Sequence, residues 1–109
     1  MLYYEFEAGN NTYKLRLNTK NTIDLEKKIG CNPLSIFGNG DTIPTVSIMV
    51  AILHASLQQY HHNISINDAY NIFDEYLTSG KTVVEFIPII LEVYKVSGLV
   101  SVSEDEEKN

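Results

Sequence analysis

The first part of the chain alternates apolar and polar side chains. The apolar positions are Leu2, Tyr4 and Phe6 before a Gly-Asn-Asn segment at 9–11, and Tyr13, Leu15 and Leu17 after it. A period of two residues around such a turn predicts a β-hairpin with one apolar face. On its other face, Glu5 and Glu7 are expected to meet Lys14 and Arg16. Because an isolated two-stranded ribbon is marginal in water, it must pack on helices or lend its edges to another sheet.

The period then changes to that of helices, and about four helices are expected. Thr22 can cap the first, which runs through "IDLEKKI" to a stop at Gly30, and "CNPLSIF" adds one more turn. A long helix is predicted from Asp41 or Thr42 through "IPTVSIMVAILHASLQQY". Its stripe marks it as the central core helix: Ile43, Val46, Val50, Leu53, Leu57 and Tyr60.

The third predicted helix opens with a capping box formed by Ser65 and Asp68 and stops at Gly80. Its expected apolar face consists of Ile66, Tyr70, Phe73 and Leu77.

The last predicted helix, "TVVEFIPIILEVYKVSGL", is apolar except for one polar stripe. That stripe contains Glu85, Pro88, Glu92 and Lys95, and it indicates the side that faces water. One apolar stripe is expected to hold the fold: Val83, Ile87, Ile90 and Tyr94. A second is the candidate partner-binding site: Phe86, Ile89, Val93, Val96 and Val100. The second stripe fits a partner-binding groove or a homo-oligomer face, and also fits burial within the domain.

Length and charge limit the possible domain organisation and the class of protein. With 109 residues, the chain is expected to form a single α+β domain at 1–100, followed by a disordered acidic tail at 101–109, "SVSEDEEKN". The formal net charge is −6, and half of it lies in the tail. That acidity argues against a general nucleic-acid binder. The chain shows neither a membrane span nor a signal peptide, so a soluble cytoplasmic protein is expected.

The residues that carry chemistry do not form a recognisable site. Cys31 is the only cysteine and is expected to be a buried small hydrophobe. His54, His61 and His62 lack the spacing of a zinc-ligand pair on one helix. The glycines at 38–40 lack the Gly-Lys-Ser/Thr ending of a phosphate loop and predict a turn. No nucleophile signature is present, so the expectation is a non-enzyme with no cofactor, no metal and no small-molecule substrate.

A rival class is a winged DNA-binding regulator. Five of the eight basic residues lie in the first third of the chain, where a hairpin and a short helix could form such a surface: Lys14, Arg16, Lys20, Lys27 and Lys28. Neighbouring acidic residues dilute that patch.

Three segments in order, "LEKKIG" at 25–30, "DEYL" at 74–77 and "ILEVYKVSG" at 90–98, resemble the tail assembly chaperones of long-tailed bacteriophages, prophages and gene transfer agents. The similarity covers residues 2–100. It implies a non-enzymatic factor that coats the tape measure protein, keeps it soluble and helps recruit tail tube subunits. It also implies action in the cytoplasm of the bacterial host and absence from the mature virion. An alternative is a small structural tail or connector protein of the virion.

The resemblance also gives the end of the chain a possible meaning. In many relatives a minority of ribosomes slip back one nucleotide near the end of this gene and make a longer product. The final "EKN" can be encoded by a sequence containing A AAA AAC, on which such a translational frameshift can occur. The other interpretation of "SEDEEKN" at 103–109 is a plain solubilising terminus.

Overall fold

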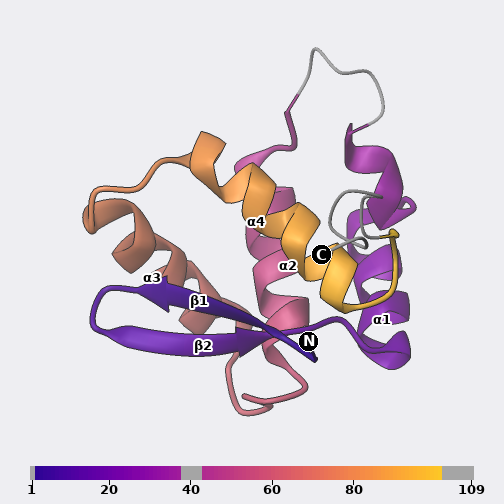
Figure 1. The fold of residues 1–109 in the computed structure, drawn as a ribbon, viewed down its shortest axis with the longest axis horizontal. Coiled ribbons are helices and arrows are strands. Elements are labelled where there is room, and N and C mark those ends of the chain that lie inside the picture. Colours follow the sequence, from indigo (N-terminus) through magenta and orange to yellow (C-terminus); the bar gives the residue numbers. More distant parts are fainter. Residues whose placement is uncertain (1, 38–42, 102–109) are drawn as a thin grey trace, which may run out of the picture.

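The computed structural model describes residues 2–37 and 43–101, and these form an N-terminal hairpin followed by four α-helices (Figure 1). The elements are β1 (Tyr4–Ala8), β2 (Asn11–Leu15), α1 (Thr19–Ile29), the 3₁₀ helix η1 (Pro33–Phe37), α2 (Val46–Leu57), α3 (Ile66–Thr78) and α4 (Val83–Val96). The predicted α+β fold, a hairpin and then helices, is confirmed. The predicted turn at 38–40 and the acidic segment 102–109 lie outside the described residues.

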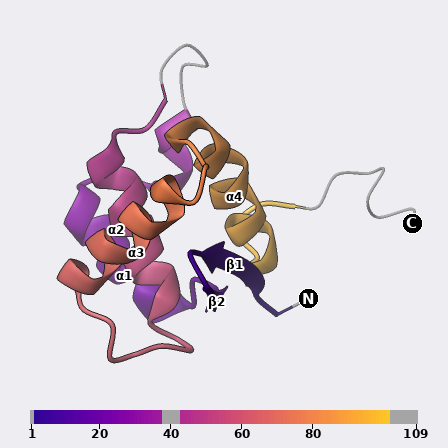
Figure 2. The same ribbon diagram turned by 90° about the vertical axis from the view of Figure 1, so that its left-hand side faces the viewer.

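Helix α2 lies at the centre and packs against α1, α3, α4 and β2. In the side view, α1, α2 and α3 lie on one side and α4 on the other, and the hairpin lies between the helix group and the lower part of α4 (Figure 2). The prediction that this helix forms the central core is confirmed, because eight of its residues are buried: Met49, Val50, Ala51, Ile52, Leu53, Ala55, Ser56 and Leu57. The helix starts later than predicted, since Thr45 is the N-cap and its Oγ1 accepts a hydrogen bond from the backbone N–H of Ile48.

The hairpin is antiparallel and closes with the two residues Gly9 and Asn10. Gly9 has a φ of 61°, which suits the first position of a two-residue turn. Glu5 lies opposite Lys14 as expected, but Glu7 lies opposite Thr12. The expected contact of Glu7 with a basic residue across the strands is therefore wrong.

Arg16 follows the end of β2 and turns to the helices instead of to β1. Its Nη1 donates to Oε1 of Gln59 over 3.1 Å.

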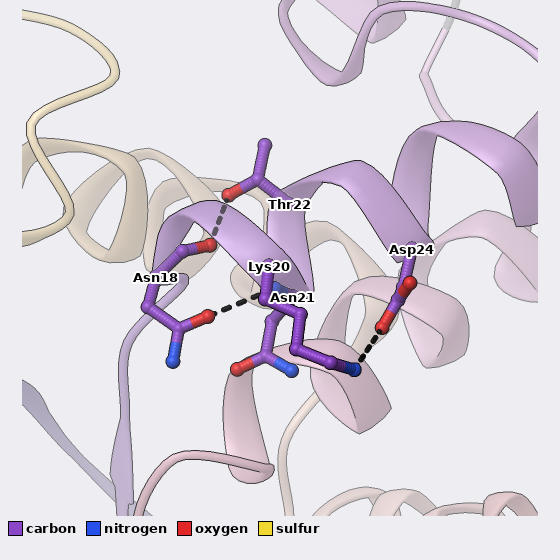
Figure 3. Close-up of polar contacts among 5 residues, drawn as sticks. All are labelled: Asn18, Lys20, Asn21, Thr22 and Asp24. Atoms are coloured by element: carbon purple, nitrogen blue, oxygen red, sulfur yellow. Dashed lines mark hydrogen bonds and ion pairs between the residues drawn. The ribbon is translucent and has the colours of Figure 1, made fainter.

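Helix α1 begins earlier than predicted. Asn18 is the N-cap, and its side chain accepts from the backbone N–H of Asn21 at 2.8 Å. Thr22, the predicted cap, lies inside the helix and donates its hydroxyl to the carbonyl of Asn18 (Figure 3). The predicted stop is confirmed, because Gly30 adopts a left-handed conformation with φ 75°. The extra turn predicted in "CNPLSIF" is η1.

Helix α3 starts with the predicted capping box, in which Ser65 and Asp68 exchange hydrogen bonds of 3.0 and 3.1 Å. Its buried face is rotated from the predicted one and consists of Ala69, Ile72, Phe73 and Tyr76. Tyr70, which was expected on the apolar face, is 52% exposed. The reason is that α3 packs against both α2 and β1, so its buried arc is centred between them.

An aromatic cluster joins the hairpin to the last two helices. Phe6 contacts Tyr76 and Phe86, and Phe73 contacts the same two rings, with centroids 5.1 to 5.9 Å apart. Such tilted and edge-to-face pairs add to the energy of apolar burial. The cluster is one of the contacts that pack this two-stranded sheet on helices, as such a sheet requires.

Candidate protein-contact site

Helix α4 carries the predicted partner-binding residues, and the structure divides them. Phe86 and Val93 are core residues, each only 1% exposed. Ile89 and Val100 are half-buried and pack against that core, and Val96 is also half-buried. Of the possibilities left open for this stripe, burial within the domain holds for Phe86 and Val93, because α4 packs against both α2 and β1. Phe86 and Val93 are therefore unavailable to a partner of the folded domain.

The stripe predicted to hold the fold lies partly on the same inner face. Ile90 and Tyr94 are fully buried, and the Tyr94 hydroxyl donates to the carbonyl of Pro33 at 2.9 Å. Burial is also the main reason that the pKa of Tyr94 is raised. Val83 and Ile87 are half-buried and pack against the core from its margin. The two predicted stripes thus merge into one inner face, which is centred on Phe86, Ile90, Val93 and Tyr94.

The outward side of α4 carries a different row of apolar side chains. We call Val84, Ile87, Pro88 and Leu91 the outer stripe. Val84 is 60% exposed and Leu91 is 39% exposed, Pro88 is exposed, and Ile87 is half-buried. The spacing i, i+3, i+4 and i+7 places all four on one side of the helix. This is the arrangement of anchors by which one helix docks against another.

The outer stripe has an acidic border. Glu85 lies in the first turn and accepts from Thr82, completing a capping box. Glu92 forms an ion pair with Lys95, in which Nζ of Lys95 lies 3.2 Å from Oε2 of Glu92. Glu85 lines a groove together with residues of β1. Burial, and then the charges of Glu92 and Glu7, raise the pKa of Tyr4 in β1. A partner on the outer stripe would meet negative charge on its β1 side.

A second concave feature lies between α1 and α2. This cleft has a volume of about 520 Å³, and its lining is mostly polar, with Asn18, Lys20, Asn21, Asp24, Lys28, His54, Gln58, Gln59 and His62 around Leu25, Ala51 and Ala55. Much of that polarity serves the fold. Lys20 pairs with Asp24 at 3.1 Å (Figure 3). Gln58 donates to the carbonyls of His54 and Ile64, both at 2.9 Å, and so ties the loop after α2.

The pKa is lowered for two histidines, His54 in the cleft lining and His61 in the loop after α2. Burial, and then the charge of Lys28, lower the pKa of His54. Burial, and then Lys14, lower the pKa of His61, whose Nε2 accepts the backbone N–H of Lys14 at 3.0 Å. Within residues 2–37 and 43–101, no three His, Cys, Asp or Glu side chains come close enough to hold a metal ion.

The structure also locates the cysteine and the basic residues that were considered in the sequence. Cys31 is exposed, so the expectation of a buried thiol is wrong; it follows the left-handed Gly30, where the chain leaves α1 at the surface. Of the basic residues, Lys14 lies over the rings of Tyr3 and Tyr60, and Lys20 pairs with Asp24. No helix in the described part of the chain is both long and apolar enough to cross a membrane.

Comparison with known proteins finds no match among family models, curated proteins or solved structures. The structure itself shows a hairpin packed on four helices, with exposed apolar side chains on α4.

Proposed function

We propose that this chain is a tail assembly chaperone of a long-tailed bacteriophage, prophage or gene transfer agent, and that it acts through protein contacts alone. It binds the tape measure protein, keeps it soluble and helps recruit tail tube subunits. It acts in the bacterial cytoplasm and leaves before the virion is complete. The resemblance of the three segments suggests this class, and the outer stripe of α4 is the observation that carries the proposal.

The outer stripe suits this task physically. A long helical protein exposes apolar faces before it assembles, and such faces aggregate unless they are covered. Val84, Ile87 and Leu91 offer apolar side chains at the spacing that matches a facing helix. Their location also revises the predicted binding residues, since Ile89, Val96 and Val100 can contribute only at the margins and Phe86 and Val93 only to the fold.

The test is co-expression of this chain with the tape measure protein encoded near its gene. The double variant Val84→Asp/Leu91→Asp is expected to fold and to lose the ability to keep the tape measure protein in the supernatant. A matched control is Ile23→Asp on α1, because Ile23 is also apolar and 44% exposed. That control should retain full chaperone activity.

Two outcomes would overturn the proposal. If the double variant solubilises the tape measure protein as well as the wild type does, the outer stripe is not the contact face. If purified particles contain the chain in fixed stoichiometry, it is a structural tail or connector protein. Steeply salt-dependent binding to duplex DNA would instead favour the regulator.

A further inference from the structure

The two edges of the hairpin differ. The outer edge of β2 is closed, because the N–H of Lys14 donates to Nε2 of His61 at 3.0 Å. The N–H of Arg16 donates in the same direction, to the carbonyl of Ser56 at 2.9 Å. In an antiparallel pair, the backbone N–H and C=O groups of successive residues point alternately toward the partner strand and away from it. Because the N–H of Lys14 points away from β1, Lys14 and the opposite residue, Glu5, form a pair without backbone hydrogen bonds between them. Their backbone groups point outward from the ladder.

The outer edge of β1 is open. By the same alternation, the N–H and C=O groups of Glu5 and Glu7 point away from β2. Within the described residues, no hydrogen bond reaches these four groups from outside the hairpin. Both side chains are exposed, so solvent reaches this part of the edge. An unpaired strand edge is a template for another strand.

A groove of about 220 Å³ runs beside that edge. Its walls are β1 and the start of α4, with Tyr76 of α3 and Ile89 of α4 as apolar contacts and Lys81 as the one basic residue among those that line it. The carboxylates of Glu5, Glu7 and Glu85 outnumber that lysine. The edge therefore combines free backbone groups, an apolar strip and a net negative charge.

We propose that the free edge of β1 binds an extended segment of a partner protein as a third strand, and that this segment alternates basic and apolar residues. Basic side chains lie on the exposed face opposite Glu5 and Glu7. The apolar residue between them lies opposite Phe6 and points to the inner side, toward the groove. Backbone hydrogen bonds supply affinity, and the alternating side chains supply specificity.

A second copy of this chain is the less suitable occupant. Two β1 strands paired antiparallel about Phe6 would place Glu5 of one copy directly opposite Glu7 of the other, twice. Like charges directly opposite each other destabilise a strand pair. The same glutamates that attract a basic strand thus prevent edge-to-edge self-association, as charged residues do on other edge strands.

This site shares Glu85 with the border of the outer stripe but binds through different residues, and it goes beyond the proposed chaperone function. It predicts binding of an extended segment, whereas the outer stripe accommodates a helix. The two are tested by different variants, so either can fail alone.

The probe is a fluorescein-labelled peptide, Lys-Val-Lys-Val-Lys, titrated with the full chain at low salt and followed by fluorescence anisotropy. The expected result is saturable binding, with no binding of Glu-Val-Glu-Val-Glu. Two further peptides carry N-methyl groups on the lysines or on the valines. A third strand uses only alternate N–H groups of the added chain, so one of the two methylated peptides should bind and the other should not.

Protein variants separate the backbone from the charge. Glu7→Pro removes an N–H that β2 does not use, and proline is tolerated on a free edge. It should weaken peptide binding by about tenfold or more. Glu7→Gln keeps the N–H and should weaken binding only roughly threefold. Circular dichroism and a thermal melt establish that both variants are folded.

The proposal is overturned if the unmodified peptide does not bind at millimolar concentration. It is also overturned if the two N-methylated peptides bind alike, because that result means attraction by charge without strand pairing. If Glu7→Pro does not fold, the methylated pair still decides the question with the wild-type chain.

Discussion

Helices α2 and α4 are both rich in apolar residues, but the fold uses them differently. α2 has neighbours on all sides, in α1, α3, α4 and β2, and it buries most of its length. α4 contacts α2 and β1, and its side chains also reach α3 and η1, but all of these contacts lie on one face, which leaves Val84 and Leu91 exposed. The comparison teaches that apolar content gives a helix the capacity for burial, whereas the placement of its neighbours, around it or on one face, decides how much apolar surface remains for a partner.

The strongest test of this comparison is a charge on the inner face of α4. Val93→Glu should unfold the domain, with a loss of at least about 4 kcal/mol, because a carboxylate would replace a side chain in the core. Urea denaturation followed by circular dichroism measures this. A folded variant of native stability would mean that Val93 faces outward, and would restore the original partner-binding stripe.

A smaller effect is expected at the helix starts. Thr82→Ala should cost about 1 kcal/mol, because it removes the capping box of a helix that is held on one face only. Thr45→Ala should cost less, about 0.5 kcal/mol, since Thr45 makes a single capping bond of 3.2 Å and α2 is held on all sides. Urea midpoints compare the two, and a larger cost at Thr45 would contradict this ranking.

The loop after α2 introduces a dependence on pH. The pKa of His61 is lowered in the folded protein, so the unfolded chain binds more protons between that lowered pKa and the ordinary value of 6.5. Stability is therefore full above 6.5 and falls as the pH drops through that window. His61→Gln should reduce this slope in urea unfolding measured across the window. An unchanged slope would assign the pH dependence to other groups, His54 first.

The smallest effect is expected on the outside of α4. Val84→Glu should change the free energy of unfolding by no more than about 0.5 kcal/mol, because Val84 is 60% exposed and lies in the first turn. Together with Val93→Glu, it forms a matched pair on one helix. A large destabilisation by Val84→Glu would show that the outer stripe is part of the core.

Much of the fold was predictable because its signals are local. The alternation around Gly9 indicated the hairpin, Gly30 indicated a helix end, and Ser65 with Asp68 indicated a capping box. The start of α1 could not be predicted in this way, because Asn18 and Thr22 are both good N-cap residues. The path of the chain out of the hairpin selects Asn18.

The candidate site was harder to predict, for a physical reason. The period of α4 shows that its apolar arc is wide, but only its neighbours decide which part of the arc is covered. The polar residues Glu85, Pro88 and Glu92 indicated the wet side, and Val84 and Leu91 lie on that side among them. The closed edge of β2 depends on a contact between Lys14 and His61, 47 residues apart, which no local pattern can indicate.

The hydrogen bond from the N–H of Leu17 to Oγ of Ser97, 2.8 Å long, joins residues 80 apart in sequence. At a synthesis rate of about 5–20 residues per second, the ribosome needs roughly 4–16 seconds to add that stretch. For most of this interval the nascent hairpin lacks Phe86, one of its core partners. The hairpin is thus synthesised first but packed against all of its helices last. Neighbouring nascent chains on one polysome therefore come close together while their N-terminal strands are not yet covered by those helices.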